Sequence, residues 1–101
     1  MAFIILRLKQ NAEEPYAIYD LEKFGKWPIR KKQLVVGNVS NNKSDITLLS
    51  NAKKKSFGKI IKTSSGWQYK FIKGTKIIEG IFSHGIKIPL FENIIEFKEE
   101  L

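Results

Sequence analysis

Residues 57–80 read FGKIIKTSSGWQYKFIKGTKIIEG, and this stretch decides the fold class. Three segments rich in β-branched and aromatic residues alternate there with turn formers, and we expect strands at Phe57–Lys62, Gly66–Ile72 and Thr75–Glu79. The turns between them fall at Thr63–Ser65 and Lys73-Gly74, and Gly80 is expected to end the third strand. Because the apolar residues do not sustain a 3.6-residue spacing, the stretch predicts paired β-strands.

The same alternation of short hydrophobic groups and turn formers runs through the rest of the chain. The further strands that we expect are Phe3–Lys9, Tyr16–Leu21, the stretch around Trp27 and Ile29, Gln33–Val36, Asp45–Leu49, Ile86–Leu90 and Ile94–Lys98. Loops or turns are expected at Asn11–Pro15, Asn38–Ser44, Ser50–Ser56, Ser83–Gly85 and Glu92-Asn93, and a helical turn only within Glu13–Lys26. About ten to eleven strands at this spacing predict an all-β fold, a β-sandwich of two antiparallel sheets.

The composition suits one domain over residues 1–101. Hydrophobic residues make up 43% of the chain, which is enough for one core. The chain has no cysteine, which excludes disulfides and thiolate metal sites, and we expect neither a metal nor a cofactor. The apolar run Met1–Leu6 is too short for a membrane span or a signal peptide. We therefore expect a cytoplasmic protein that does not enter a membrane.

Positive charge is concentrated in the middle of the chain. Between Lys23 and Ile78 there are fourteen Lys or Arg residues and one acid, Asp45, and the formal net charge of the whole chain is +8. A surface with this imbalance attracts anions. The charge predicts binding to a phosphorylated or acidic protein segment or to nucleic acid, and does not choose between them.

A series of short motifs adds a family resemblance. A strand ending at Gly37 is followed by a polar loop, by Asp45-Ile46-Thr47-Leu48, by a lysine-rich loop and by the strand that starts at Phe57. A strand with Trp67, the turn Gly74-Thr75, Gly80 and a closing strand pair follow. In this order, residues from Trp27 to Phe97 resemble the forkhead-associated (FHA) domain. The resemblance implies a β-sandwich that binds phosphothreonine peptides through the loops at one end.

The chain departs from the family at the residues that bind phosphate. Asn38 stands where the family has arginine, Lys54 where it has serine, Phe57 where it has histidine, and Lys73 where it has the asparagine that holds the peptide backbone. Lysine attracts phosphate but lacks the planar fork of arginine that orients it. The predicted ligand-binding residues at the loop end are Asn38, Ser40, Lys53, Lys54, Lys55, Ser56, Lys73 and Thr75.

These observations predict a non-enzymatic protein–protein interaction module. The partner would be an acidic or phosphorylated segment, as in phosphopeptide binding and signalling, or the chain would be a subunit of a larger assembly. The alternatives are a basic β-domain that binds nucleic acid phosphates non-specifically and an inert structural domain. His84 is the only histidine and is expected in a turn, and Glu92 and Glu96 are expected at the surface. No catalytic motif appears, so we do not expect an enzyme.

Overall fold

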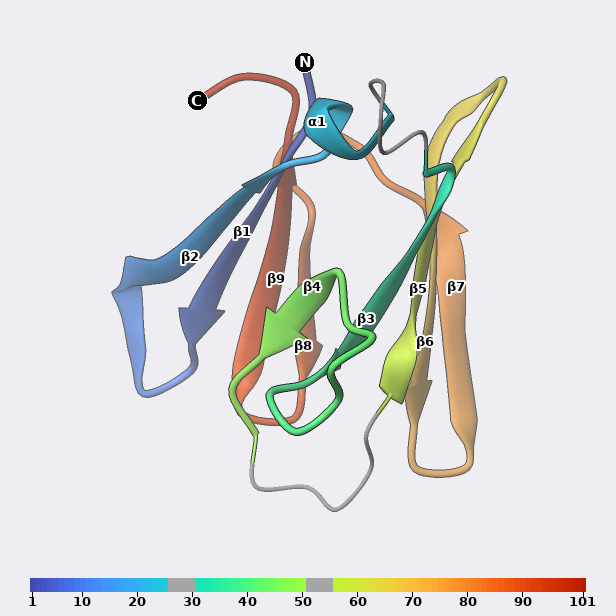
Figure 1. Ribbon diagram of the computed structural model, residues 1–101. Coiled ribbons are helices and arrows are strands. Elements are labelled where there is room, and N and C mark those ends of the chain that lie inside the picture. The colour runs from blue at the N-terminus through green and yellow to red at the C-terminus, as the bar shows by residue number, and fades with distance from the viewer. Residues whose placement is uncertain (26–30, 51–55) are drawn as a thin grey trace. The chain divides into compact units, whose positions relative to one another are not determined.

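The computed structural model describes residues 1–25, 31–50 and 56–101 (Figure 1). These residues form nine strands and one helical turn, which are β1 (Phe3–Leu8), β2 (Asn11–Asp20), α1 (Glu22–Gly25), β3 (Gln33–Asn38), β4 (Ile46–Leu48), β5 (Ser56–Thr63), β6 (Gly66–Lys73), β7 (Lys76–Ile81), β8 (Lys87–Leu90) and β9 (Asn93–Lys98). They form two mostly antiparallel sheets, as in a β-sandwich, so the predicted fold class is confirmed. The chain divides into two compact units, residues 1–31 with 83–101 and residues 32–82. The assignment of all 101 residues to one domain stays a prediction.

The first unit contains a four-stranded antiparallel sheet in the order β2-β1-β9-β8. On one face, Ile4 lies opposite Phe97 and Leu6 lies opposite Ile95, and all four side chains are buried. Burial of such apolar pairs is the main stabilising contribution to a sheet of this kind. On the other face, Arg7 forms an ion pair with Glu96.

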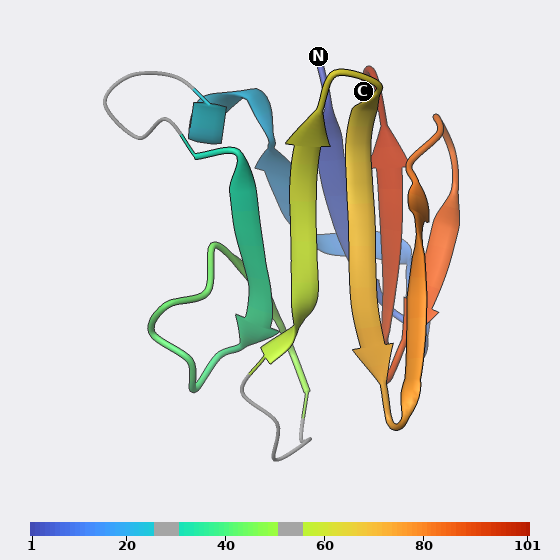
Figure 2. The same cartoon turned by 90° about the vertical axis from the view of Figure 1, so that its right-hand side faces the viewer.

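The second unit contains the five-stranded sheet, in the order β4-β3-β5-β6-β7. Figure 2 shows β3, β5, β6 and β7 side by side, from teal to orange. Among the strands formed by the described residues, only β3 and β4 pair in parallel. Leu34, Ile60 and Tyr69 lie opposite one another across β3, β5 and β6, which places them on one face of the sheet. Leu34, Ile60 and the neighbouring Phe71 are fully buried on this core face. Trp67, expected at a buried or half-buried strand position, is 6% exposed.

The loop predicted at Asn11–Pro15 is wrong, because these residues form the first half of β2. Pro15 is tolerated there because β2 is an edge strand, where a missing backbone N–H leaves no ladder bond unmade. The pairing of β1 with β2 shifts register on both sides of Arg7. These shifts allow the polar first half of β2 to pair despite its proline.

Several other predicted boundaries differ from the structure by one or two residues, among them those at Gly80 and Glu92. Gly80 does not end its strand, because β7 continues to Ile81. A Cβ atom on Gly80 would lie 2.8 Å from the hydroxyl of Tyr69, so glycine makes room for the tyrosine ring. The last turn falls at Phe91 and Glu92, one residue earlier than expected. Asn93 instead begins β9, where it is fully buried and accepts a hydrogen bond from the Tyr16 hydroxyl.

The number of strands in the described residues is nine, against ten to eleven predicted. The strand expected around Trp27 and Ile29 lies outside the described residues. The helical turn allowed within Glu13–Lys26 is present as α1, and His84 lies in a turn as predicted.

Candidate functional site

One end of the five-stranded sheet collects most of the described residues that the sequence predicts to bind a ligand. Gly37 pairs with Ser56, and Lys73 pairs with Lys76. Continuing the β5–β6 register from Gly58 and Phe71 places Ser56 level with Lys73. We call this end of the sheet the loop end, and define it by the exposed residues Ser40, Ser56, Lys73, Thr75 and Lys76. It lies at the lower end of the sheet in Figure 1, where β3 ends and the β6–β7 turn lies.

The loop end spans four adjacent strands, β3, β5, β6 and β7. Neighbouring strands lie about 4.8 Å apart, so the row from Gly37 to Lys76 is about 14 Å long. An extended peptide covers that length with about four residues. The row is therefore of the right size for a short peptide segment.

Asn38 lies at this end but does not offer its side chain to a ligand. It is 5% exposed, and its Nδ2 donates a hydrogen bond to the Ser50 carbonyl oxygen at 3.1 Å. Its Oδ1 accepts a longer hydrogen bond, of 3.4 Å, from the Ser40 backbone N–H. Asn38 thus connects the β3–β4 loop to the segment after β4, and its role is to position the loops.

Asp45 holds the other end of the same loop. Its Oδ2 accepts a hydrogen bond from the Val35 N–H at 2.8 Å, and its own N–H donates to the Val35 carbonyl oxygen at 2.9 Å. These two hydrogen bonds tie the end of the β3–β4 loop to β3. Phe57 is fully buried and anchors the start of β5 in the core.

Two pairs of lysines lie directly opposite each other on neighbouring strands of this sheet. Lys73 faces Lys76 at the loop end, and Lys59 faces Lys70 further along the sheet. Like charges in directly opposite positions destabilise a sheet. Among the described residues, no hydrogen bond or ion pair joins Lys73 or Lys76 to an acid. The loop end therefore has uncompensated positive charge that a bound anion would neutralise.

The charge of the chain is divided unequally between the two units. Residues 32–82 contain ten lysines and only two acids, Asp45 and Glu79, which gives a formal charge of +8. The remaining residues contain eight basic and eight acidic side chains and are formally neutral. The whole net charge of the chain thus belongs to the unit that contains the loop end.

Lys76 belongs to the loop end but is not among the residues that the sequence predicts to bind a ligand. The sequence nevertheless contained a signal for Lys76. Two strands joined by a two-residue turn at Gly74-Thr75 place the residues on either side of the turn, Lys73 and Lys76, opposite each other. Lys53, Lys54 and Lys55, also predicted to bind the ligand, lie outside the described residues. The segment that contains them joins Ser50 to Ser56, and Ser56 is itself at the loop end.

The residues that the structure describes offer neither a cluster of metal-binding side chains nor a membrane-spanning helix. Within residues 1–25, 31–50 and 56–101, no group of three or more histidine, aspartate or glutamate side chains is placed to hold a metal ion. In the same residues, no helix has the length and apolar character needed to cross a bilayer. Comparison with known proteins adds no assignment, since no protein-family model and no curated protein match the chain.

Proposed function

We propose that this chain is a non-enzymatic interaction module that binds an acidic or phosphorylated protein segment at the loop end of its five-stranded sheet. The module is a divergent relative of the forkhead-associated domain, acts in the cytoplasm, and needs neither a metal nor a cofactor. Lys73 and Lys76 supply the charge, and the hydroxyl groups of Ser40, Ser56 and Thr75 supply hydrogen bonds.

The observation that carries this proposal is the pair Lys73 and Lys76. These lysines occupy opposite positions on the two strands of a tight hairpin, are exposed, and have no acidic partner among the described residues. A sheet that needed only stability would favour opposite charges there. A phosphate group, with about −1.5 to −2 charges at neutral pH, would convert this repulsion into attraction.

The order of elements supports the relationship to the forkhead-associated domain. Gly37 lies in β3, the polar loop follows, and Ile46–Leu48 forms β4. Phe57 lies in β5, and Gly74-Thr75 forms the turn before β7. These segments follow one another in the order on which the resemblance rests, although the residues that hold phosphate in the family are replaced. Binding would therefore depend on charge more than on an oriented hydrogen-bond network, and would be weaker and less selective.

The first test is titration with a phosphothreonine peptide, its unphosphorylated form and an aspartate-rich peptide. At moderate salt, the double variant Lys73→Glu, Lys76→Glu should lose about tenfold or more in affinity, since each reversal replaces attraction with repulsion. The matched control is Lys9→Glu, Lys87→Glu, which changes the net charge equally at exposed positions of the first unit. Equal losses in both variants would show that net charge alone drives binding and would contradict the proposed site.

Nucleic acid is the competing ligand, and salt separates the two classes. Binding of an oligonucleotide through lysines weakens steeply with salt and ignores base sequence. If an oligonucleotide of arbitrary sequence binds as tightly as the phosphopeptide at moderate salt, the interaction-module proposal fails. A preference for the phosphorylated or acidic peptide over both the neutral peptide and the oligonucleotide supports it.

A further inference from the structure

β7 is an edge strand of the five-stranded sheet that is neither short nor irregular, although it carries the charged residues Lys76 and Glu79. Edge strands are commonly short, irregular or interrupted by proline. Of the other edges, β4 has three residues, β2 contains Pro15 and register shifts, and β8 has four residues including Pro89. β7 has six residues, no proline and an unbroken register with β6. Among the described strands, β7 is thus the edge best suited to accept another strand.

One hydrogen bond between β6 and the end of β7 identifies the backbone groups that face the open side of β7. The Phe82 N–H donates to the Trp67 carbonyl oxygen at 2.9 Å. In antiparallel pairs, residues alternate between those that exchange hydrogen bonds with the neighbour and those that face away. Lys76, Ile78 and Gly80 therefore bond to β6, in phase with Phe82. The N–H and C=O groups of Ile77, Glu79 and Ile81 point to the open side.

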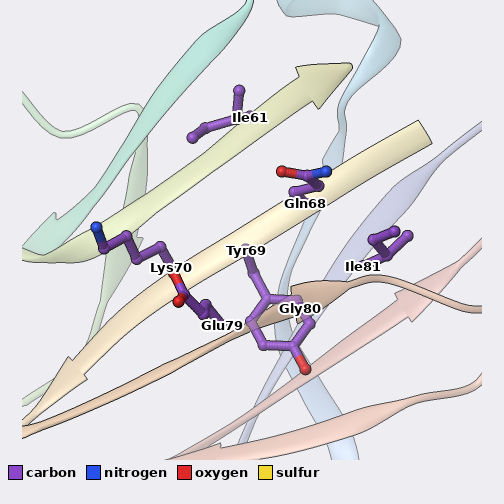
Figure 3. A pocket seen from close by; sticks show the side chains of 7 residues that line it. All are labelled: Ile61, Gln68, Tyr69, Lys70, Glu79, Gly80 and Ile81. Atoms are coloured by element: carbon purple, nitrogen blue, oxygen red, sulfur yellow. The ribbon is translucent and has the colours of Figure 1, made fainter. Parts of the chain in front are cut away.

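The side chains of the same three residues lie on the outer face of the sheet, opposite the core face. Ile77 and Ile81 are 57% and 54% exposed. Next to them is an open groove of about 240 Å³ that crosses β5, β6 and β7. Its lining residues are Ile61, Gln68, Tyr69, Lys70, Glu79, Gly80 and Ile81 (Figure 3). Apolar side chains from an added strand would cover the exposed isoleucines.

The charges along this edge define the sequence of the strand that fits. Glu79 lies between the two isoleucines, so the residue opposite it should be basic or uncharged. Lys76 and Lys73 lie beyond Ile77, so acidic residues should follow at that end. A partner strand that runs antiparallel to β7 meets Ile81 first and Lys76 last. From its N-terminus, it should therefore carry apolar, basic and apolar residues at alternate positions, followed by acidic residues.

We infer that β7 accepts an extended protein segment with this sequence as a sixth, antiparallel strand. The acidic end of the segment reaches the loop end, so this part of the inference rests on the proposed function. The strand pairing along Ile77, Glu79 and Ile81 does not depend on the proposed function. Backbone hydrogen bonds would supply affinity, and the alternating side chains would supply selectivity, as in other cases of strand addition.

The test uses a synthetic peptide, Val-Thr-Lys-Thr-Val-Glu-Glu, and amide hydrogen exchange of the labelled full chain. In the free protein, the amides of Ile77, Glu79 and Ile81 should exchange quickly, while those of Ile78 and Gly80 are already slowed by bonds to β6. Saturation with the peptide should slow exchange at all three outward amides. Failure of the peptide to bind at low salt, or binding without this slowing, would overturn the inference.

Backbone N-methylation of the peptide at different positions provides a matched control. N-methylation of the central lysine removes a hydrogen bond to β7 and should weaken binding by roughly three- to tenfold. N-methylation of either threonine, whose N–H faces away from β7, should leave the affinity nearly unchanged. Equal effects of both modifications would contradict strand addition. The substitution Ile81→Thr should also weaken binding more than Ile18→Thr, which changes an isoleucine on β2 that is 50% exposed.

A third peptide separates this inference from the proposed function. In Val-Thr-Lys-Thr-Val-Gln-Gln the acids are replaced by neutral amides. If it binds as well as the acidic peptide while the effect of N-methylation persists, the strand site stands and the loop-end function fails. If the acids matter and N-methylation does not, the reverse holds. Slow exchange of the outward amides without peptide, increasing with protein concentration, would identify a second copy of the chain as the occupant and overturn the peptide assignment.

Discussion

Gly58 illustrates how a single residue determines the path of the five-stranded sheet. It has a φ of +142°, and a Cβ atom there would lie 2.0 Å from the Lys70 carbonyl oxygen. The register of β3 with β5 shifts next to it, between Val36 and Gly37, as at a β-bulge. Neither the backbone angle nor the close approach of β6 tolerates a side chain.

We expect Gly58→Ala to lower the free energy of unfolding by about 3 kcal/mol or more, because strain and steric overlap add. Urea denaturation followed by tryptophan fluorescence measures this change. The control is Gly66→Ala, which has a φ of +118° but open space around the added Cβ. Its cost should be about 1–2 kcal/mol, from backbone strain alone. Similar losses in both variants would contradict the importance of the contact with β6.

Asn38 has a structural role that its place in the sequence motif conceals. Replacement by alanine removes the hydrogen bond to the Ser50 carbonyl oxygen and the one from the Ser40 N–H. We expect Asn38→Ala to cost about 1–2 kcal/mol of stability, the range for a buried group that loses its hydrogen bond. Asn42→Ala, at an exposed position of the same loop, should change stability by less than about 0.5 kcal/mol. The same denaturation assay decides, and an equally small effect at Asn38 would contradict the bracing role.

At the scale of elements, the sequence predicts the strands of the five-stranded sheet best. Alternating apolar residues and glycine-containing turns define β5, β6 and β7 nearly to their ends, because local turn chemistry and the side-chain period agree there. The first half of β2 fails because its polar residues and proline resemble a loop, and only its pairing with β1 makes it a strand. Edge position is a property of the assembled sheet and leaves no local signal.

The candidate site was predictable only in part, for the same reason. Motif order placed Asn38, Ser56 and Lys73 at one end, and β3, β5 and β6 do bring them there. The burial of Asn38 could not be foreseen, because it depends on a hydrogen bond to Ser50, twelve residues away. The open side of β7 likewise depends on the sheet order. Long-range pairing thus determines which polar residues can meet a ligand.

At the scale of the whole molecule, the formal charge is divided unequally between the two units. All of the formal net charge lies in residues 32–82, and the other unit is balanced. The balanced unit also pairs its buried carboxylate, since Glu96, expected at the surface, is 4% exposed and bonded to Arg7. Charge is therefore compensated where it is buried and left uncompensated at the loop end. This distribution favours selective encounter with anions on one unit.

The most direct test of binding at the loop end is chemical-shift mapping of the isotopically labelled chain during titration with a phosphothreonine peptide at moderate salt. We predict that the amide signals of Ser40, Ser56, Lys73 and Thr75 shift most and saturate together. Signals of the first unit, such as those of Lys9 and Lys87, should hardly change. Shifts spread evenly over the exposed lysines of both units, or none at the loop end, would contradict the claim that this end binds an anionic protein segment.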